Sequence, residues 1–438
     1  MRKLLSILFW SVLSAAFIGP GTVTVASKAG HLFGLELLWA LTFSTLACAT
    51  LQEASARIAL SSGSDLGQAL RLRYRDSWMR FLVLPLVVVA IVVGCAAYQA
   101  GNILGGVAGA KLVCDLDDRW ITLCMGLAAG LILWFGSVKW VARILGGVVA
   151  LMGVVFLVTA ACLLPPWSDV LSGLLIPSSP AGSGLLVLGL VGTTVVPYNL
   201  FLGSGIARGQ KLKELRFGLI LAVALGGLVS MGVVVVGTSV QGDFSFENLA
   251  AALTARLGTW AGPLFAVGLF SAGLSSAITA PLAAAITARG LTGGGSADAT
   301  DHCSRLYRAT WGLVLLTGVA FGIFGQKPIP IILVAQAFNG VLLPFVTVFL
   351  LLLVNDRSLM GEEGLNRMPG NALLSLVVAV TVLLGLKNIL EAVYGALDSH
   401  PPGRSVLLLI SVLVTAVLFA LVFPRLRRTR RSPAQKRA

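Results

Sequence analysis

Apolar runs of roughly 20 residues, separated by short polar segments, constrain this chain more than any other feature. A run of this length crosses a hydrocarbon core of about 30 Å as a helix, and a helix satisfies its own backbone hydrogen bonds in lipid. Because 57% of the residues are hydrophobic and only 11% are charged, a soluble domain is excluded. A transmembrane barrel would show shorter, alternating strands. The sequence therefore predicts an all-α polytopic membrane protein.

About twelve membrane-spanning helices are expected, which puts both ends of the chain on one side. The expected spans are 8–30, 35–60, 81–108, 120–138, 143–165, 185–207, 217–238, 261–288, 309–325, 329–354, 370–394 and 404–424. They form a single transmembrane domain, residues 1–424, followed by a basic tail, residues 425–438. The first apolar run begins like a signal peptide but continues without a small-residue cleavage site, so it is interpreted as a span.

Basic residues account for the net charge of +14, and they collect in every second polar segment. The intervening segments hold few of them, mainly Lys111, Arg119, Arg256, Lys327 and Arg404. This asymmetry predicts an integral protein of the inner or plasma membrane with both termini cytoplasmic. The basic tail is interpreted as an anchor beside anionic lipid, so the lipid bilayer is an expected partner and nucleic acid is not.

Two spans are interrupted at comparable places. The first contains Gly19-Pro20-Gly21-Thr22, and the sixth contains the segment from Thr193 to Asn199, with Pro197 near its centre. Proline removes a helix donor and glycine loosens the backbone, so each break exposes backbone groups that protein, water or ligand must satisfy. Breaks five spans apart fit an inverted repeat of five plus five helices, with a solute held between them. The alternative is that proline only kinks a packed helix.

No signature of catalysis is present. The sequence has no nucleophile elbow and no phosphate-binding loop, and its six cysteines form no CxxC pair or cysteine–histidine cluster. The chain is therefore expected to be a transporter and not an enzyme, with no catalytic residues and no cofactor.

Separate short motifs follow one another along the chain. The sixth span reads GTTVVPYNLFLGS from Gly192 to Ser204, where G-A-T-V-M-P-H-N-L-Y-L-H-S would be the family pattern, and Gly19-Pro20-Gly21-Thr22 stands in place of D-P-G-N. The other matching segments are 51–57, 273–279 and 356–361. In order and spacing these motifs resemble the Nramp family of divalent metal transporters, over about residues 8 to 365.

The resemblance implies a LeuT-like fold with broken helices 1 and 6, and proton-coupled symport of manganese, iron and similar divalent cations by alternating access. It also implies a metal site, but the residues at the ligand positions differ from the family pattern. The positions equivalent to the family's metal ligands are Gly19, Thr22, Thr193 and Val196, and those of its acidic third-helix residues are Ala90 and Val93. The metal ligands of this chain are therefore not identified by the resemblance.

The predicted substrate-binding residues lie at the two breaks and on the tenth span. They are Gly19, Pro20, Gly21, Thr22, Thr193, Thr194, Val196, Pro197, Tyr198, Asn199, Gln336 and Asn339. Their hydroxyls, amides and carbonyls carry no charge, whereas a divalent ion stripped of water needs strong compensating donors. Three hypotheses follow: a transporter of a divalent metal cation (manganese, iron or magnesium-like) with an atypical site, a transporter of a non-metal polar or organic solute, or a transport-inactive sensor or scaffold. A largely hydrated ion such as magnesium could be held through its waters. Alternatively, the amides only tie broken backbone to neighbouring helices.

Overall fold

The computed structural model describes residues 18–135, 138–207, 212–292, 305–396 and 404–430, and the regular elements within them are α-helices. Residues 8–17 of the first expected span and 431–438 of the expected tail lie outside these ranges. The helices are α2 (Pro20–Phe33), α3 (Leu38–Ser62), α4 (Leu66–Tyr74), α5 (Arg80–Lys111), α6 (Asp118–Phe135), α7 (Val138–Leu163), α8 (Trp167–Leu175), α9 (Gly184–Thr194), α10 (Pro197–Ala207), α11 (Leu212–Gly237), α12 (Phe246–Leu257), α13 (Ala261–Thr292), α14 (Arg305–Ile323), α15 (Pro328–Leu353), α16 (Arg357–Gly364), α17 (Met368–Ala396) and α18 (Arg404–Arg430).

The long helices confirm an all-α polytopic membrane protein. Among the described residues, nine helical segments are long and apolar enough to cross a membrane, α9 and α10 counting as one. The other expected spans correspond to α2, α3 and α18: the described part of α2 has 14 residues, α3 has 25, and the apolar part of α18 is Leu409–Pro424. α18 continues to Arg430, past the position where the tail was expected to begin.

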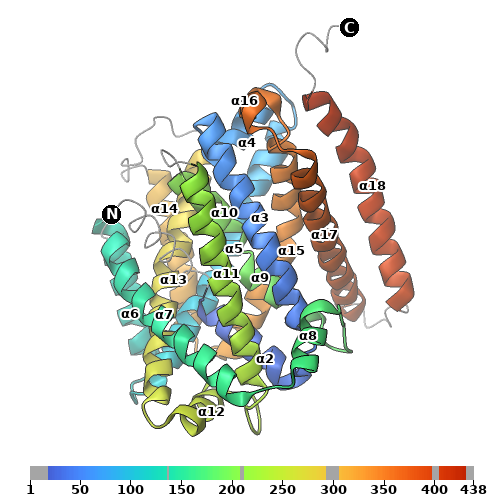
Figure 1. The fold of residues 1–438 in the computed structure, drawn as a ribbon. Coiled ribbons are helices and arrows are strands. Elements are labelled where there is room, and N and C mark those ends of the chain that lie inside the picture. Colours follow the sequence, from blue (N-terminus) through green and yellow to red (C-terminus); the bar gives the residue numbers. More distant parts are fainter. Residues whose placement is uncertain (1–17, 136–137, 208–211, 293–304, 397–403, 431–438) are drawn as a thin grey trace, which may run out of the picture.

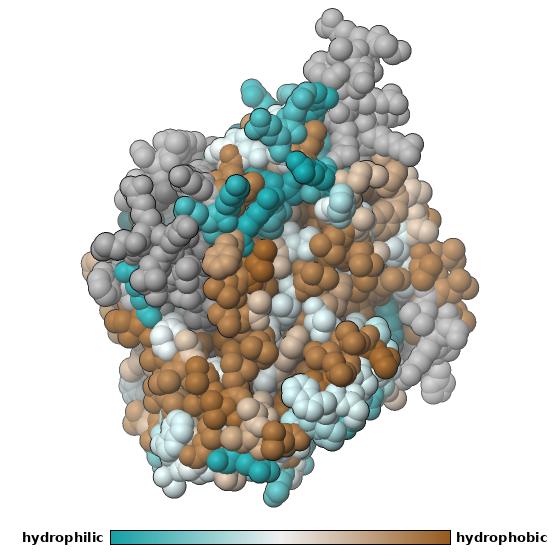
Figure 2. All heavy atoms as spheres, in the orientation of Figure 1, coloured by the Kyte–Doolittle hydropathy of each residue, from teal (hydrophilic) through white to brown (hydrophobic). Residues whose placement is uncertain are grey.

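Four short helices, α4, α8, α12 and α16, were not predicted, because hydropathy identifies only apolar segments that are long enough to span a membrane. α4 and α16 lie at one end of the bundle, near the end of α18, and α8 and α12 lie at the other end (Figure 1). On the face shown in Figure 2, the surface between the two ends is mainly hydrophobic, and hydrophilic residues gather near the ends. The molecule therefore presents a band suited to lipid with polar caps above and below.

The centre of the bundle is built on α5 and α13, the third and eighth expected spans, which pack on each other and have 32 residues each. Glycine lets them touch: a Cβ added to Gly273 would lie 2.6 Å from the Cα of Gly106. Small residues at such crossings bring helix backbones together in membranes. α2, α9 and α15 pack on one another beside this pair, and they carry the candidate site.

Candidate substrate site between the broken helices

The sixth span is interrupted as predicted, but over fewer residues than the expected segment from Thr193 to Asn199. At the first break the described residues begin at Ile18, and Gly21 and Thr22 already belong to α2. α2 begins at Pro20, preceded by Gly19 in an extended conformation with φ −94° and ψ 176°. α9 ends at Thr194 and α10 begins at Pro197, so Val195 and Val196 separate the two half-helices. Proline at each helix start needs no hydrogen-bond acceptor for its nitrogen, which makes it suited to these positions.

A hydrogen bond joins the breaks. The hydroxyl oxygens of Thr22 and Thr193 lie 2.8 Å apart, and each residue is 1% exposed. Residues 171 positions apart in the chain thus share a bond in the interior. The bond places the first turn of α2 against the last turn of α9.

Helix α15 lies against both broken helices at Gln336. A Cβ added to Gly21 would lie 2.0 Å from the side-chain nitrogen of Gln336, and one added to Gly192 would lie 2.1 Å from its backbone oxygen. A side chain in place of Gly21 would force the Gln336 side chain to move, and one in place of Gly192 would force the α15 backbone to move. Gln336 therefore belongs to the same site as the threonine pair.

Tyr98 of α5 and Ser276 of α13 also belong to this site but were not among the predicted binding residues, although Ser276 lies in the matching segment 273–279. Tyr98 of α5 stacks edge-to-face on the predicted Tyr198, with ring centroids 5.4 Å apart. Its hydroxyl lies close to Gly19 and to Ser276 of α13, and it interacts with Gln336 as well. The signal available in the sequence was a tyrosine in the middle of the apolar run 81–108, but only the fold shows that it faces the break.

Some predicted residues contribute less directly. The Thr194 hydroxyl donates to the backbone oxygen of Leu190, 2.8 Å away, which is one turn back in its own helix. Asn339 lies beside Gly94 of α5, with its side-chain oxygen 3.7 Å from the position of an added Cβ, so it marks the α5 side of α15. Pro20 contacts Gly105 of α5 in the same way, at 2.2 Å from an added Cβ, and serves helix packing.

Two buried polar atoms on α15 have no hydrogen-bond partner among the described residues: the side-chain oxygen of Gln336 and the side-chain nitrogen of Asn339. Each residue is 1% exposed. Buried polar atoms are nearly always hydrogen-bonded, and an orphan at a helix break is a place for a solute or a water. Gln336 supplies an acceptor and Asn339 a donor, so both kinds of hydrogen bond are available to a solute.

The side chains of the site carry no formal charge. In the part of the chain that the structure describes, no group of three or more His, Cys, Asp and Glu residues could hold a metal ion. The predicted third-helix positions, Ala90 and Val93, line an apolar cavity and carry no titratable group. Glu53 lies elsewhere, on α3, where its carboxylate pairs with Arg57 and Arg216.

The Glu53 cluster ties α3 to the segment after α16. Arg57 donates from one guanidinium nitrogen to the backbone oxygen of Gly364 and from another to the side-chain oxygen of Asn366, each at 2.9 Å. Asn366 in turn donates to Asn371 at 2.8 Å. This polar network closes the end of the bundle where α4 and α16 lie (Figure 1).

Comparisons with known proteins agree with the fold. Residues 11–391 match the family described as Nramp, natural resistance-associated macrophage protein-like. Two relatives are named divalent metal cation transporter MntH: that of Ralstonia nicotianae is 29% identical, covering 85% of this chain and 87% of the relative, and that of Deinococcus radiodurans is 26% identical, covering 82% and 84%.

Solved structures show the same architecture. The Eremococcus coleocola manganese transporter, in complex with an aromatic bis-isothiourea substituted compound, is 21% identical, covers 98% of this chain and 95% of its own, and superposes with a TM-score of 0.73. Mhp1, a nucleobase-cation-symport-1 family transporter solved with bromovinylhydantoin bound, is 14% identical, covers 99% and 95%, and has a TM-score of 0.57. These likenesses support the LeuT-like helical arrangement with two broken helices.

Proposed function

This chain belongs to the Nramp family and is a membrane transporter rather than an enzyme, and we propose that it moves a divalent metal cation, retaining much of its water shell, by alternating access between its broken helices. One observation carries the proposal: the side-chain oxygen of Gln336 has no partner among the described residues, and Gln336 packs against Gly21 and Gly192, the chain neighbours of the hydrogen-bonded threonines. Substrate sites of broken-helix transporters lie at such breaks.

The choice of a hydrated ion follows from charge. A bare divalent cation in an uncharged interior would lose far more hydration energy than hydroxyls and amides return. Magnesium gives up its waters reluctantly and is held through few protein ligands, so neutral oxygens can bind it through its water shell. Manganese or iron would lack the soft and acidic ligands that favour them.

Proton coupling, which the family resemblance implies, needs a titratable group along the path. Ala90 and Val93 carry none, so symport in this chain has to use another group. Comparing uptake with and without a pH gradient tests for coupling. The proposal also keeps both termini cytoplasmic, in an inner or plasma membrane, because the basic segments alternate along the chain.

A second candidate is a neutral polar or organic solute. Two buried atoms without a partner among the described residues favour it: the side-chain oxygen of Gln336, which accepts, and the side-chain nitrogen of Asn339, which donates. The side chains of the site carry no formal charge. Contacts from Thr22, Tyr198 and Asn199 would complete its hydrogen bonds.

Thermal unfolding of the purified protein distinguishes the two, because a ligand that binds only the folded state raises Tm as its concentration rises. A concentration-dependent rise with magnesium chloride, absent from the Gln336→Leu variant and from a sodium chloride control of equal ionic strength, supports the cation. A rise in Tm only with uncharged solutes, again absent from the Gln336→Leu variant, supports the second candidate instead.

A further inference from the structure

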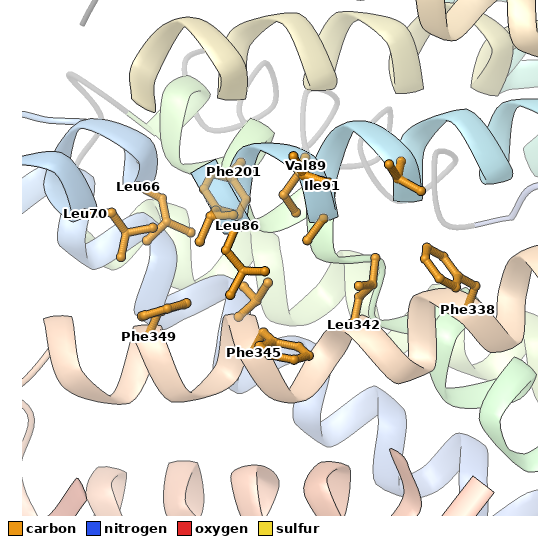
Figure 3. A pocket seen from close by; sticks show the side chains of 14 residues that line it. Leu66, Leu70, Leu86, Val89, Ile91, Phe201, Phe338, Leu342, Phe345 and Phe349 are labelled. Carbon is orange, nitrogen blue, oxygen red and sulfur yellow. The ribbon is translucent and has the colours of Figure 1, made fainter. Parts of the chain in front are cut away.

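An apolar cavity of about 260 Å³ lies between α5 and α15 (Figure 3). Side chains from α5 and α15 form its two walls, and α4 and α10 close one end. Leu66 and Leu70 come from α4 and Phe201 from α10, while Phe345 and Phe349 project from α15. All of its lining residues are apolar, so the cavity suits a hydrocarbon ligand.

The cavity opens on the outer surface of the bundle. Leu86, Val89 and Val93 on the α5 wall are 45%, 57% and 46% exposed, and Phe345 on the α15 wall is 49% exposed. Both walls belong to helices that are long and apolar enough to span a membrane. The opening therefore faces the hydrocarbon of the bilayer.

One end of the cavity adjoins a basic surface. Leu66 and Leu70 lie on α4, and the same helix and the turn into α5 carry Arg71, Arg75 and Arg80, whose side chains are exposed. Asp76 is the one acidic residue between Arg71 and Arg80. Basic pockets beside spanning helices attract anionic lipid headgroups.

We propose that this cavity binds one acyl chain of an anionic phospholipid whose headgroup lies against Arg71, Arg75 and Arg80. The apolar walls accept the chain, and the arginines supply the preference for negative charge. The proposal does not depend on the transported solute, because no residue of the candidate site lines the cavity.

The acyl chain would also support the spacing of α5 and α15. Leu342 lines the cavity and lies 2.8 Å from a Cβ added to Gly94, and Asn339 is 3.7 Å from the same point. A bound acyl chain would therefore rest one helical turn from the orphan amide of Asn339.

Native mass spectrometry of the full-length protein, purified in the presence of equal phosphatidylglycerol and phosphatidylcholine, tests the proposal. We expect the wild-type protein to retain phosphatidylglycerol, and Ala90→Trp, which fills the cavity, to lower that retention by about tenfold. Leu313→Trp, at a 60% exposed position on α14, is the matched control and should retain lipid like the wild type. Equal retention by Ala90→Trp and wild type overturns the proposal.

The position of the headgroup is tested with a double variant, Arg71→Gln combined with Arg75→Gln. We expect this variant to lose the preference for phosphatidylglycerol over phosphatidylcholine, and an unchanged preference would contradict the assigned headgroup position.

If Ala90→Trp does not fold, a phosphatidylglycerol with a diazirine in its acyl chain is photolysed on the wild-type protein. Labelled peptides should map to α5 and α15 around the cavity, whereas labelling spread evenly over all spans overturns the proposal.

Discussion

The hydroxyl oxygens of Thr22 and Thr193 lie 2.8 Å apart and join the two broken helices inside the bundle. The family resemblance aligns both positions with metal ligands, and here the two hydroxyls hydrogen-bond to each other. A solute that enters must compete with this bond or add to it. The site is therefore expected to bind its solute through hydrogen bonds and not through ion pairs. The predictions below test that description.

Adding a charged and a soft ligand should create a manganese site. Thr22→Asp combined with Val196→Met brings a carboxylate and a thioether to the breaks, and these ligands suit manganese better than hydroxyl and isopropyl groups. We expect manganese affinity to rise by about tenfold or more in isothermal titration. Thr22→Val with Val196→Leu is the size-matched control and should show no gain; a double variant no better than this control would contradict the alignment of the breaks.

Replacing the orphan amide should separate stability from transport. Gln336→Leu removes a buried oxygen without a partner among the described residues, and such an atom costs about 1–3 kcal/mol when left unpaired. The substitution also removes the amide nitrogen side of an interaction with Tyr98, so the gain and the loss oppose each other and we expect little change in the unfolding temperature, together with a loss of uptake. A variant that keeps full uptake would remove Gln336 from the site.

Glycine should be required where α9 meets α15. Gly192→Ala would push a methyl group against backbone oxygen and should destabilise the protein by about 1–3 kcal/mol. Gly147→Ala on α7 is the matched control, because its Cβ would meet nothing within 4 Å, and it should be neutral or stabilising by up to about 1 kcal/mol. Denaturation of both variants in one detergent, followed by circular dichroism, measures the difference; equal effects would argue against the close approach.

Arg57 should contribute more to the stability of the folded protein than Arg216 does, although both pair with Glu53. The Arg57 side chain is 10% exposed and makes two further hydrogen bonds, so Arg57→Ala should cost about 2 kcal/mol. The Arg216 side chain is 47% exposed, and its replacement by alanine should cost less than about 1 kcal/mol. Thermal unfolding at low and high salt checks this order, and a larger loss for Arg216→Ala would contradict it.

Hydropathy predicted the spans because each is long enough to cross lipid alone, and the glycine–proline breaks were visible for the same local reason. The short helices α4, α8, α12 and α16 were missed, since hydropathy does not register helices too short to span and their length is set by packing. The extension of α18 to Arg430 was missed because charge marks the membrane boundary and not the end of a helix.

The site was predicted only in part. Thr22, Thr193 and Gln336 were expected from the breaks and the family motifs, and the structure brings them together. Tyr98 and Ser276 come from spans whose local sequence gives no sign of a break, so their place beside Gly19 follows from the packing of α5 and α13. Likewise, no sequence pattern indicated that Ala90 and Val93 would line a cavity open to lipid.

Uptake into proteoliposomes tests the central claim most directly. Magnesium and manganese are offered to the purified wild-type protein, to Gln336→Leu and to protein-free liposomes, with and without a pH gradient. A cation transporter with a neutral site predicts saturable magnesium uptake above the protein-free control that disappears in Gln336→Leu. Absence of saturable flux of either ion through protein shown to be folded would contradict cation transport.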